Sequence, residues 1–347
     1  MTSRERVLTA FEHNEPDRVP CWCGASVEFW EKTKWQLQLD DEGLRMRFRD
    51  DFRRVFAEYA GPDFPLSKTA THQTIFGVER RGIGYGQPLN HLLANATLKE
   101  VHDYHWPNPE WMDVSKIKAQ AEAYQGEYAI LGGDWSPFWH DAIDLLGMEN
   151  LYMKMYDQQE LVDAVMQHIV DYYAAVSQRI FDAAADAIDI FFIGNDFGSQ
   201  NGPLLGANLF NRFILPHLKR LIDLGHAYGL KVQLHCCGGF AALIPQMIEA
   251  GLDGLHAVQP SCYGMNLAEL KTNFGDKILF NGAIDSHHVL IDGSVDFVRQ
   301  KTRQVLEIMK PGGGYVAGAS HDTILEETPL ENVLAMFDTV GEYGVYK

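Results

Sequence analysis

Ile188-Asp-Ile-Phe-Phe-Ile-Gly-Asn-Asp196 and Lys231-Val-Gln-Leu-His-Cys-Cys-Gly-Gly239 each have the pattern of a short buried strand that ends in polar side chains. The residues between them, 207–228, have the length and apolar spacing of a helix. The same alternation extends in both directions. Strands are predicted at 128–133, 188–194, 231–234, 254–258, 278–283 and 315–318, and helices at 147–155, 159–184, 207–228, 239–250, 266–273 and 293–309. Alternating strands and helices predict a parallel sheet covered by helices.

The number and even spacing of these units favour a closed barrel over an open Rossmann sheet. No G-x-G-x-x-G follows a first strand, which also argues against a dinucleotide fold. Residues 3–14 predict an amphipathic helix and 18–24 a first strand. Residues 25–125 are rich in charge, aromatics and glycine, and predict helices and an excursion that decorates the barrel mouth. We therefore expect one α/β domain over 1–347, a distorted (β/α)₈ TIM-type barrel.

Composition narrows the functional classes. The 347 residues include 29 basic and 47 acidic side chains, for a formal net charge of −18. Because such a surface repels phosphate backbones and anionic head groups, we expect no nucleic-acid partner. No apolar run reaches about 18 residues, so no membrane span is expected. The charged start lacks the apolar stretch of a secretory signal, which predicts a cytoplasmic protein.

Polar side chains follow six successive predicted strands. In a barrel the carboxyl ends of the strands converge on one rim, where barrel enzymes hold their chemistry. These side chains therefore predict an active site. They are Asp134 and Trp135, Asn195 and Asp196, His235 and Cys237, His256 and Gln259, Asp285, and Ser320 with His321 and Asp322.

The sharpest local feature is the pair His235 and Cys237. Residues i and i+2 at a strand end point the same way, and a thiolate with an imidazole suits zinc. The alternative is that His235 caps the strand and the cysteines are core residues. A third ligand has to come from elsewhere in the chain. The candidates are His321, Asp322, Asp196, Cys262 and Cys23.

Tryptophan and phenylalanine follow two of the strands, as Trp22, Phe29, Trp30 and Trp35 and as Trp135, Phe138 and Trp139. If both groups line the mouth, they form an apolar pocket for a flat or methyl-bearing ligand. The alternative is that they pack loops onto the barrel. The residues we expect to contact substrate are Trp22, Cys23, Trp135, Asn195, His256 and Gln259.

Several motifs, in order along nearly the whole chain, resemble the uroporphyrinogen decarboxylase superfamily, whose fold is a distorted (β/α)₈ barrel. They are Arg4-Glu-Arg-Val-Leu-Thr-Ala10, Pro16-Asp-Arg-Val-Pro20, Leu234-His-Cys-Cys-Gly238, Phe280-Asn-Gly-Ala-Ile-Asp285, Gly312-Gly-Gly-Tyr-Val-Ala-Gly-Ala-Ser-His321 and Thr328-Pro-Leu-Glu-Asn332. True decarboxylases carry an arginine-rich segment after the first strand. Here that stretch is Cys21-Trp-Cys-Gly-Ala-Ser-Val-Glu-Phe-Trp30, which has no arginine to clamp a polyanionic tetrapyrrole.

The chain is more similar to the other branch, the corrinoid-dependent methyltransferases of the methylcobalamin:coenzyme M type. That resemblance implies zinc held by His235 and Cys237 plus a later cysteine. This sequence has Ser320 and His321 at the corresponding place. Either His321 replaces the cysteine as third ligand, or the site holds no zinc. A homodimer is expected from the family alone.

The resemblance implies methyl transfer between a small substrate and a corrinoid carried by a partner protein. The substrate is a thiol, or an aryl or alkyl methyl ether or amine. Asp134, Asp196 or Asp285 then donates a proton or orients a ligand. One alternative is a decarboxylase or lyase acting on a smaller acid, with Arg53-Arg54 and Arg80-Arg81 as candidate cations. Another is a non-catalytic corrinoid- or tetrapyrrole-binding barrel.

Overall fold

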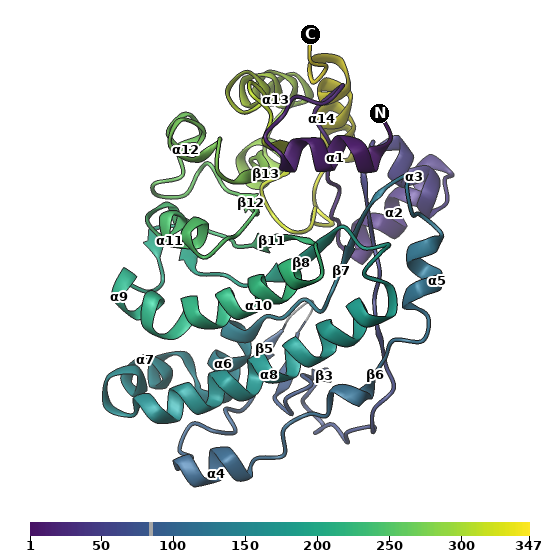
Figure 1. Cartoon of the computed structure of the whole chain (residues 1–347). Coiled ribbons are helices and arrows are strands. Elements are labelled where there is room, and N and C mark those ends of the chain that lie inside the picture. The colour runs from purple at the N-terminus through teal and green to yellow at the C-terminus, as the bar shows by residue number, and fades with distance from the viewer. Residues whose placement is uncertain (83–85) are drawn as a thin grey trace.

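A seven-stranded, all-parallel sheet forms the centre of the computed structural model, which describes residues 1–82 and 86–347 (Figure 1). The strands, in spatial order, are β1 (Phe52–Arg54), β7 (Ala129–Gly132), β8 (Ile190–Gly194), β11 (Lys231–His235), β12 (Gly254–Val258), β13 (Leu279–Ile284) and β14 (Tyr315–Ala319). The six strands predicted after residue 126 are confirmed. β1 was not predicted, because three residues are too short to show a period.

The predicted first strand, 18–24, lies between the two edges of this sheet. Cys21 forms parallel bridges to Asp50, just before β1, and to Ala317 of β14. The Ala317 N–H donates to Pro20 O at 2.8 Å, and the Asp51 N–H donates to Cys21 O at 3.0 Å. This segment therefore closes the barrel through single bridges and not through the regular strand that was predicted over 18–24.

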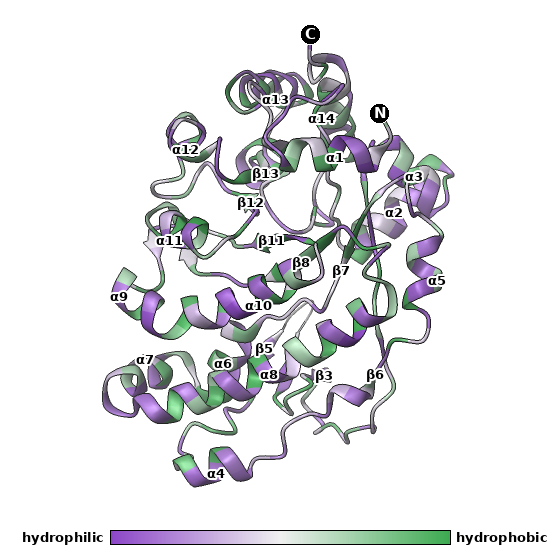
Figure 2. Cartoon of the chain, in the orientation of Figure 1, coloured by the Kyte–Doolittle hydropathy of each residue, from purple (hydrophilic) through white to green (hydrophobic). Residues whose placement is uncertain are grey.

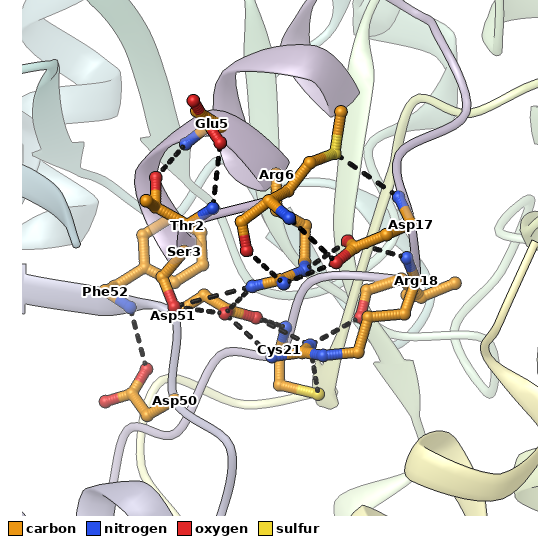
Figure 3. Close-up of polar contacts among 12 residues, drawn as sticks. Thr2, Ser3, Glu5, Arg6, Asp17, Arg18, Cys21, Asp50, Asp51 and Phe52 are labelled. Carbon is orange, nitrogen blue, oxygen red and sulfur yellow. Dashed lines mark hydrogen bonds and ion pairs between the residues drawn. The ribbon is translucent and has the colours of Figure 1, made fainter. Parts of the chain in front are cut away.

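Asp51 holds residues 18–24, the closing segment of the barrel, in place (Figure 3). Its fully buried carboxylate accepts hydrogen bonds from the Cys21 N–H at 2.8 Å and from the guanidinium groups of Arg6 at 2.8 Å and Arg18 at 2.9 Å. Ser3 adds a further bond, at 2.7 Å. A buried carboxylate needs such compensation, since desolvation without partners is costly. The arginines of the two N-terminal motifs thus hold the barrel closed.

α1 (Ser3–Phe11) closes the end of the barrel opposite the strand-end rim. Thr2 and Glu5 form a capping box at its start, and Val7 and Phe11 pack into the inner cluster of the barrel beside Phe52 and Phe192. Arg4 pairs with Asp189, the residue before β8, at 2.8 Å. The amino ends of the strands are therefore covered, and the carboxyl ends remain for a site.

Helices with one apolar face surround the sheet (Figure 2). They are α6 (Phe138–Leu146), α7 (Met148–Asp157), α8 (Gln159–Ala184), α9 (Ala207–Leu209), α10 (Leu215–Ala227), α11 (Ile244–Glu249), α12 (Leu267–Phe274), α13 (Val295–Met309) and α14 (Leu330–Tyr343). π-Helical turns occur at η2 (Phe210–Ile214) and η4 (Ser286–Ile291), and a 3₁₀ turn at η3 (Ala241–Leu243). The predicted helices are confirmed; α6 and α14 were missed. No helix of the described chain is long and apolar enough to cross a membrane.

Residues 25–125 contain the predicted helices, as α2 (Val27–Leu37), α3 (Asp41–Arg47), α4 (Leu98–Asp103), α5 (Ile117–Glu122) and the 3₁₀ turn η1 (Pro109–Trp111). They also contain short antiparallel pairings that the sequence did not suggest. These are β2 (Glu58–Tyr59) with β6 (Met112–Asp113), and β3 (His72–Gln73) with β4 (Glu79–Arg81) and β5 (Gln87–Pro88). A further pair, β9 (Gly198–Ser199) with β10 (Gly202–Pro203), follows β8.

Candidate metal centre

Three potential metal ligands meet at the strand-end rim, where β8 and β11 end. Sγ of Cys237 lies 3.4 Å from Nε2 of His235, and Oδ1 of Asp196 lies 3.5 Å from the same nitrogen. The ligand atoms of Asp196, His235 and Cys237 all lie within 4.8 Å of one another. Two neighbouring parallel strands bring them together, since Gly194 and His235 are register partners.

Two glycines, Gly238 and Gly239, allow the tight turn that follows β11. Gly238 has φ +87°, and a Cβ there would lie 2.4 Å from the backbone carbon of Gly198. The Gly238 N–H donates to Oε1 of Gln259 at 2.8 Å, and the Gly239 N–H donates to Ser199 O at 2.8 Å. The chain around Cys237 is therefore packed against two other loops, which fixes the thiol at the rim.

The charges of this group suit a cation. Burial favours a raised pKa for Asp196, but the hydrogen bond from His140, the nearby His235 and the Cys237 N–H hold that pKa well below its usual value. Burial lowers the pKa of His235, so its imidazole is neutral near pH 7, as a ligand must be. Burial and Asp196 raise the pKa of the Cys237 thiol. A bound cation would favour the thiolate form of this side chain.

The spacing matches zinc. Zinc bonds of about 2.0–2.3 Å at tetrahedral angles place two ligand atoms roughly 3.3–3.6 Å apart. The two measured separations from His235 Nε2, 3.4 Å to sulfur and 3.5 Å to oxygen, fall in that interval. One carboxylate, one imidazole and one thiol also leave a fourth tetrahedral position open, as catalytic zinc sites do.

His321 does not join this group. Its Nδ1 lies 3.2 Å from the Thr323 N–H, which donates to it within the loop after β14. Among the residues that the structure describes, no three-ligand group contains His321. A second group combines His235 with His256 and Asp322. Of the candidate third ligands, Asp196 therefore lies in a group with His235 and Cys237, and His321 does not.

The other predicted polar residues lie nearby in different surroundings. Asn195 is fully buried and bonds backbone groups of Trp139 and Ser136 at 2.9 and 3.0 Å. Asp285 caps η4 by accepting from the N–H groups of His287 and His288. Both side chains therefore form hydrogen bonds with backbone groups nearby. Gln259 likewise supports the turn after β11.

Asp134 follows β7 and lines a cavity of about 290 Å³ together with Trp135 and Arg54. Burial raises the pKa of its carboxyl group, while the Ser136 N–H and the charge of Arg54 oppose that shift. The Trp135 ring lies 5.3 Å from the His235 ring, centroid to centroid. Asp134 is thus a carboxyl group near the metal-ligand group that can hold a proton.

A larger cavity, about 420 Å³, opens between the barrel mouth and α2. Trp22, Cys23, Trp30, Phe52 and Phe56 give it apolar walls. Three arginines, Arg45, Arg53 and Arg54, also line it. Asp322 borders both cavities and belongs to the second ligand group, so both cavities reach the neighbourhood of His235.

Two residues near the candidate metal centre could be identified from the sequence only weakly or not at all. His140, in α6, places Nε2 3.3 Å from Oδ2 of Asp196, on the far side of that carboxylate from His235. A lone histidine in an unpredicted helix follows no motif. Arg54 was only a candidate for the lyase alternative. Its guanidinium lies over the rings of Phe56, Trp135 and Phe192 at 4.9, 5.2 and 5.4 Å. Its place at the mouth follows from β1, which was not predicted.

Comparison with known proteins places this geometry in a family. The model of the uroporphyrinogen decarboxylase (URO-D) family matches residues 94–343. The methylcobamide:CoM methyltransferase MtbA of Methanosarcina acetivorans is 22% identical over 99% of this chain and 98% of its own length. A uroporphyrinogen decarboxylase of Solibacter usitatus is 26% identical over 54% of this chain and 50% of its own.

A solved structure described as a methyltransferase from Methanosarcina mazei superposes with a TM-score of 0.72 and covers 99% of both chains. Its sequence identity to this chain is 18%, so this likeness concerns the fold. It agrees with the barrel predicted from the sequence.

Proposed function

Because the chain belongs to the uroporphyrinogen decarboxylase family, with relatives among its methyltransferases, we propose that it is a zinc-dependent methyltransferase that works with a corrinoid protein. The observation that carries this proposal is the group of Asp196, His235 and Cys237, whose ligand atoms lie within 4.8 Å of one another, with the sulfur and one oxygen 3.4 and 3.5 Å from Nε2 of His235. An arginine-clamped tetrapyrrole site would not need a thiol and an imidazole at the rim.

Asp196, His235 and Cys237 would hold the ion. Bound zinc would act as a Lewis acid on the sulfur, oxygen or nitrogen of the substrate, stabilising a thiolate or polarising a methyl ether or amine. The chain's own residues supply the rest. His140 orients the Asp196 carboxylate, and the turn at Gly238 holds Cys237 in place.

The two cavities are suited to bind the small substrate of this reaction. Trp22, Phe52 and Trp135 offer apolar walls for a methyl-bearing body. Asp134 would hold or donate a proton to the leaving heteroatom, since burial keeps its carboxyl group easier to protonate than usual. The corrinoid of the partner protein would approach from the open mouth, the end of the barrel that α1 does not cover.

A direct assay tests the proposal. Zinc-loaded protein is mixed with methylcobalamin and a panel of thiols, and separately with cobalt(I) cobalamin and methyl ethers or amines. We expect transfer in one direction, visible as a change in the corrinoid spectrum, and its loss in Cys237→Ser. Stoichiometric zinc with no transfer to or from any corrinoid would contradict the proposal.

One observation favours a second candidate, a lyase acting on a carboxylated substrate. Arg54 lines both cavities, and a guanidinium on an aromatic wall is suited to a carboxylate. Release of carbon dioxide from a carboxylate substrate by metal-free protein would favour this candidate over methyl transfer. The third alternative, a corrinoid- or tetrapyrrole-binding barrel without catalysis, predicts tight binding and no turnover in either assay.

A further inference from the structure

A second polar layer lies inside the barrel, next to the candidate metal centre. It consists of Gln233 on β11, His256 on β12 and Asn281 on β13. His235 is the register partner of His256, and His256 is the register partner of Asn281. Gln233 precedes His235 by two residues and so shares its face. All three side chains of the layer have 0% exposure.

The layer contains polar atoms that no side chain or backbone group of the described chain satisfies. These are Nε2 and Oε1 of Gln233, Nε2 of His256, and Nδ2 and Oδ1 of Asn281. A buried polar atom without a partner is costly, so folded proteins rarely tolerate several together. Ordered water is the usual partner in such a place. Three unsatisfied side chains on adjacent strands therefore indicate a built water site.

His256 connects this layer to the metal ligands. Its Nδ1 lies 3.1 Å from Nδ1 of His235, and both rings are buried. One proton lies between two nitrogens at this distance, so one ring donates and the other accepts. A neutral imidazole ring carries a single N–H, on one of its two nitrogens.

The metal decides which ring donates. When Nε2 of His235 binds an ion, its proton must be on Nδ1, which then donates to Nδ1 of His256. The single proton of His256 is then on Nε2, the ring nitrogen that no group of the described chain satisfies. In the metal-free protein the reverse arrangement leaves Nε2–H of His235 facing Oδ1 of Asp196, 3.5 Å away. The two neutral rings hold two protons in both arrangements.

We propose that His256 is a positioning residue that fixes the metal-binding tautomer of His235, and that Gln233 and Asn281 hold an ordered water which accepts from Nε2–H of His256. This proposal rests on the proposed function, because it needs a metal at His235. Hydrogen bonds of this kind to the free nitrogen of a ligating histidine orient the ring and commonly change metal affinity 10–100-fold.

The surroundings hold the His256 ring in place. The ring of Trp22 packs edge-on against it at 5.0 Å, and the ring of Phe192 at 5.3 Å, between centroids. The ladder between β12 and β13 shifts register immediately after His256, where Ala257 has φ +33°. Strained backbone at a bulge of this kind re-aims side chains and is concentrated at functional sites.

The test compares zinc affinity and histidine tautomers. Zinc dissociation constants are measured by chelator competition for wild type, His256→Leu, His256→Asn and Leu255→Val. His256→Asn keeps an acceptor oxygen near the position of Nδ1, and Leu255→Val is a control on the same strand. We expect a 10–100-fold weaker affinity in His256→Leu, and values within a few-fold of wild type in the other two. ¹⁵N NMR of labelled histidines in wild type should show His256 changing from Nδ1–H to Nε2–H when zinc is added.

The outcomes distinguish a failure of this inference from a failure of the proposed function. Zinc binding by wild type with equal affinity in His256→Leu, or no tautomer change on zinc addition, would overturn this inference and leave the proposed function standing. If wild type binds no zinc, both fall. The NMR measurement uses wild type alone, so it decides the matter even where His256→Leu does not fold.

Discussion

Nε2 of His140 lies 3.3 Å from one oxygen of Asp196, while the other oxygen of the same carboxylate faces His235 and accepts from the Cys237 N–H at 2.7 Å. The carboxylate is therefore held from both sides. A residue from α6 thus supports a carboxylate that follows β8 and lies beside His235. Outer partners of this kind support metal ligands.

We predict that His140→Ala weakens zinc binding by about 10–100-fold, because Asp196 loses the partner that orients it. His140→Gln should recover most of the affinity, since its amide nitrogen can reach the position of Nε2. Chelator competition at fixed pH measures both values. Equal affinity in wild type and His140→Ala would show that Asp196 needs no such support or does not bind the metal.

The third ligand can be identified by substitution. Asp196→Ala should remove tight zinc binding, a larger effect than the roughly 10–100-fold typical of an outer partner. His321→Ala should leave the affinity near that of wild type, because the His321 ring is engaged by the Thr323 backbone. Metal content after dialysis compares the two variants. The opposite ranking would make His321 the ligand, as the family resemblance allowed.

Asp51 should dominate the stability of the closing segment. Asp51→Ala leaves Arg6 and Arg18 without their buried partner, and breaking a buried ion pair costs about 3–5 kcal/mol. Asp338→Ala is the control, since Asp338 pairs with Arg47 at a site where both side chains are more than one-third exposed. Such surface pairs contribute about 0–1 kcal/mol. Urea unfolding should separate the two variants; similar midpoints would contradict the role given to Asp51.

Asp141 should make stability depend on pH. Burial raises the pKa of its carboxyl group to about 7, against opposition from the Tyr173 hydroxyl, and Asp144 adds to the rise. The folded state therefore keeps a proton that the unfolded state releases near its ordinary pKa of 3.8. Stability from this group is present at low pH and is lost as pH rises toward 7, at about 1.4 kcal/mol per pH unit.

Asp141→Asn removes this titration. Between pH 5 and pH 8 we expect wild type to lose about 2–3 kcal/mol of unfolding free energy relative to the variant. Urea unfolding in the presence of a chelator measures the difference without any contribution from bound metal. Parallel pH profiles for the two proteins would show that the Asp141 carboxyl group titrates normally.

Much of the barrel was predictable, because its strands after residue 126 are buried on both faces and read as continuous apolar runs between helical stretches. β1 was missed because its three residues, Phe52–Arg54, include two arginines. The closing segment at Cys21 has no regular ladder, so its role depends on Asp51, far away in sequence. The short strands of the excursion form two-residue pairings, which are too short to show a period.

The strand-end residues of the candidate site could be predicted from the sequence, but the residues that support them could not. His235 and Cys237 stand out because strand alternation places them on one face. The choice of Asp196 over His321 depends on how two loops turn, and the support from His140 depends on an unpredicted helix. The N-terminal motifs carried part of the family resemblance, and their Arg6 and Arg18 pair with Asp51, which holds the closing segment.

Metal content of the purified wild-type chain, compared with Cys237→Ser, tests the central claim most directly. Protein prepared without chelator and supplied with zinc should retain about one zinc per chain after dialysis, and Cys237→Ser should retain much less, because the site loses its thiolate. Circular dichroism would confirm that the variant is folded. A folded wild type that retains no zinc, or retains it equally without the Cys237 thiol, would contradict the metal centre and with it the proposed methyl transfer.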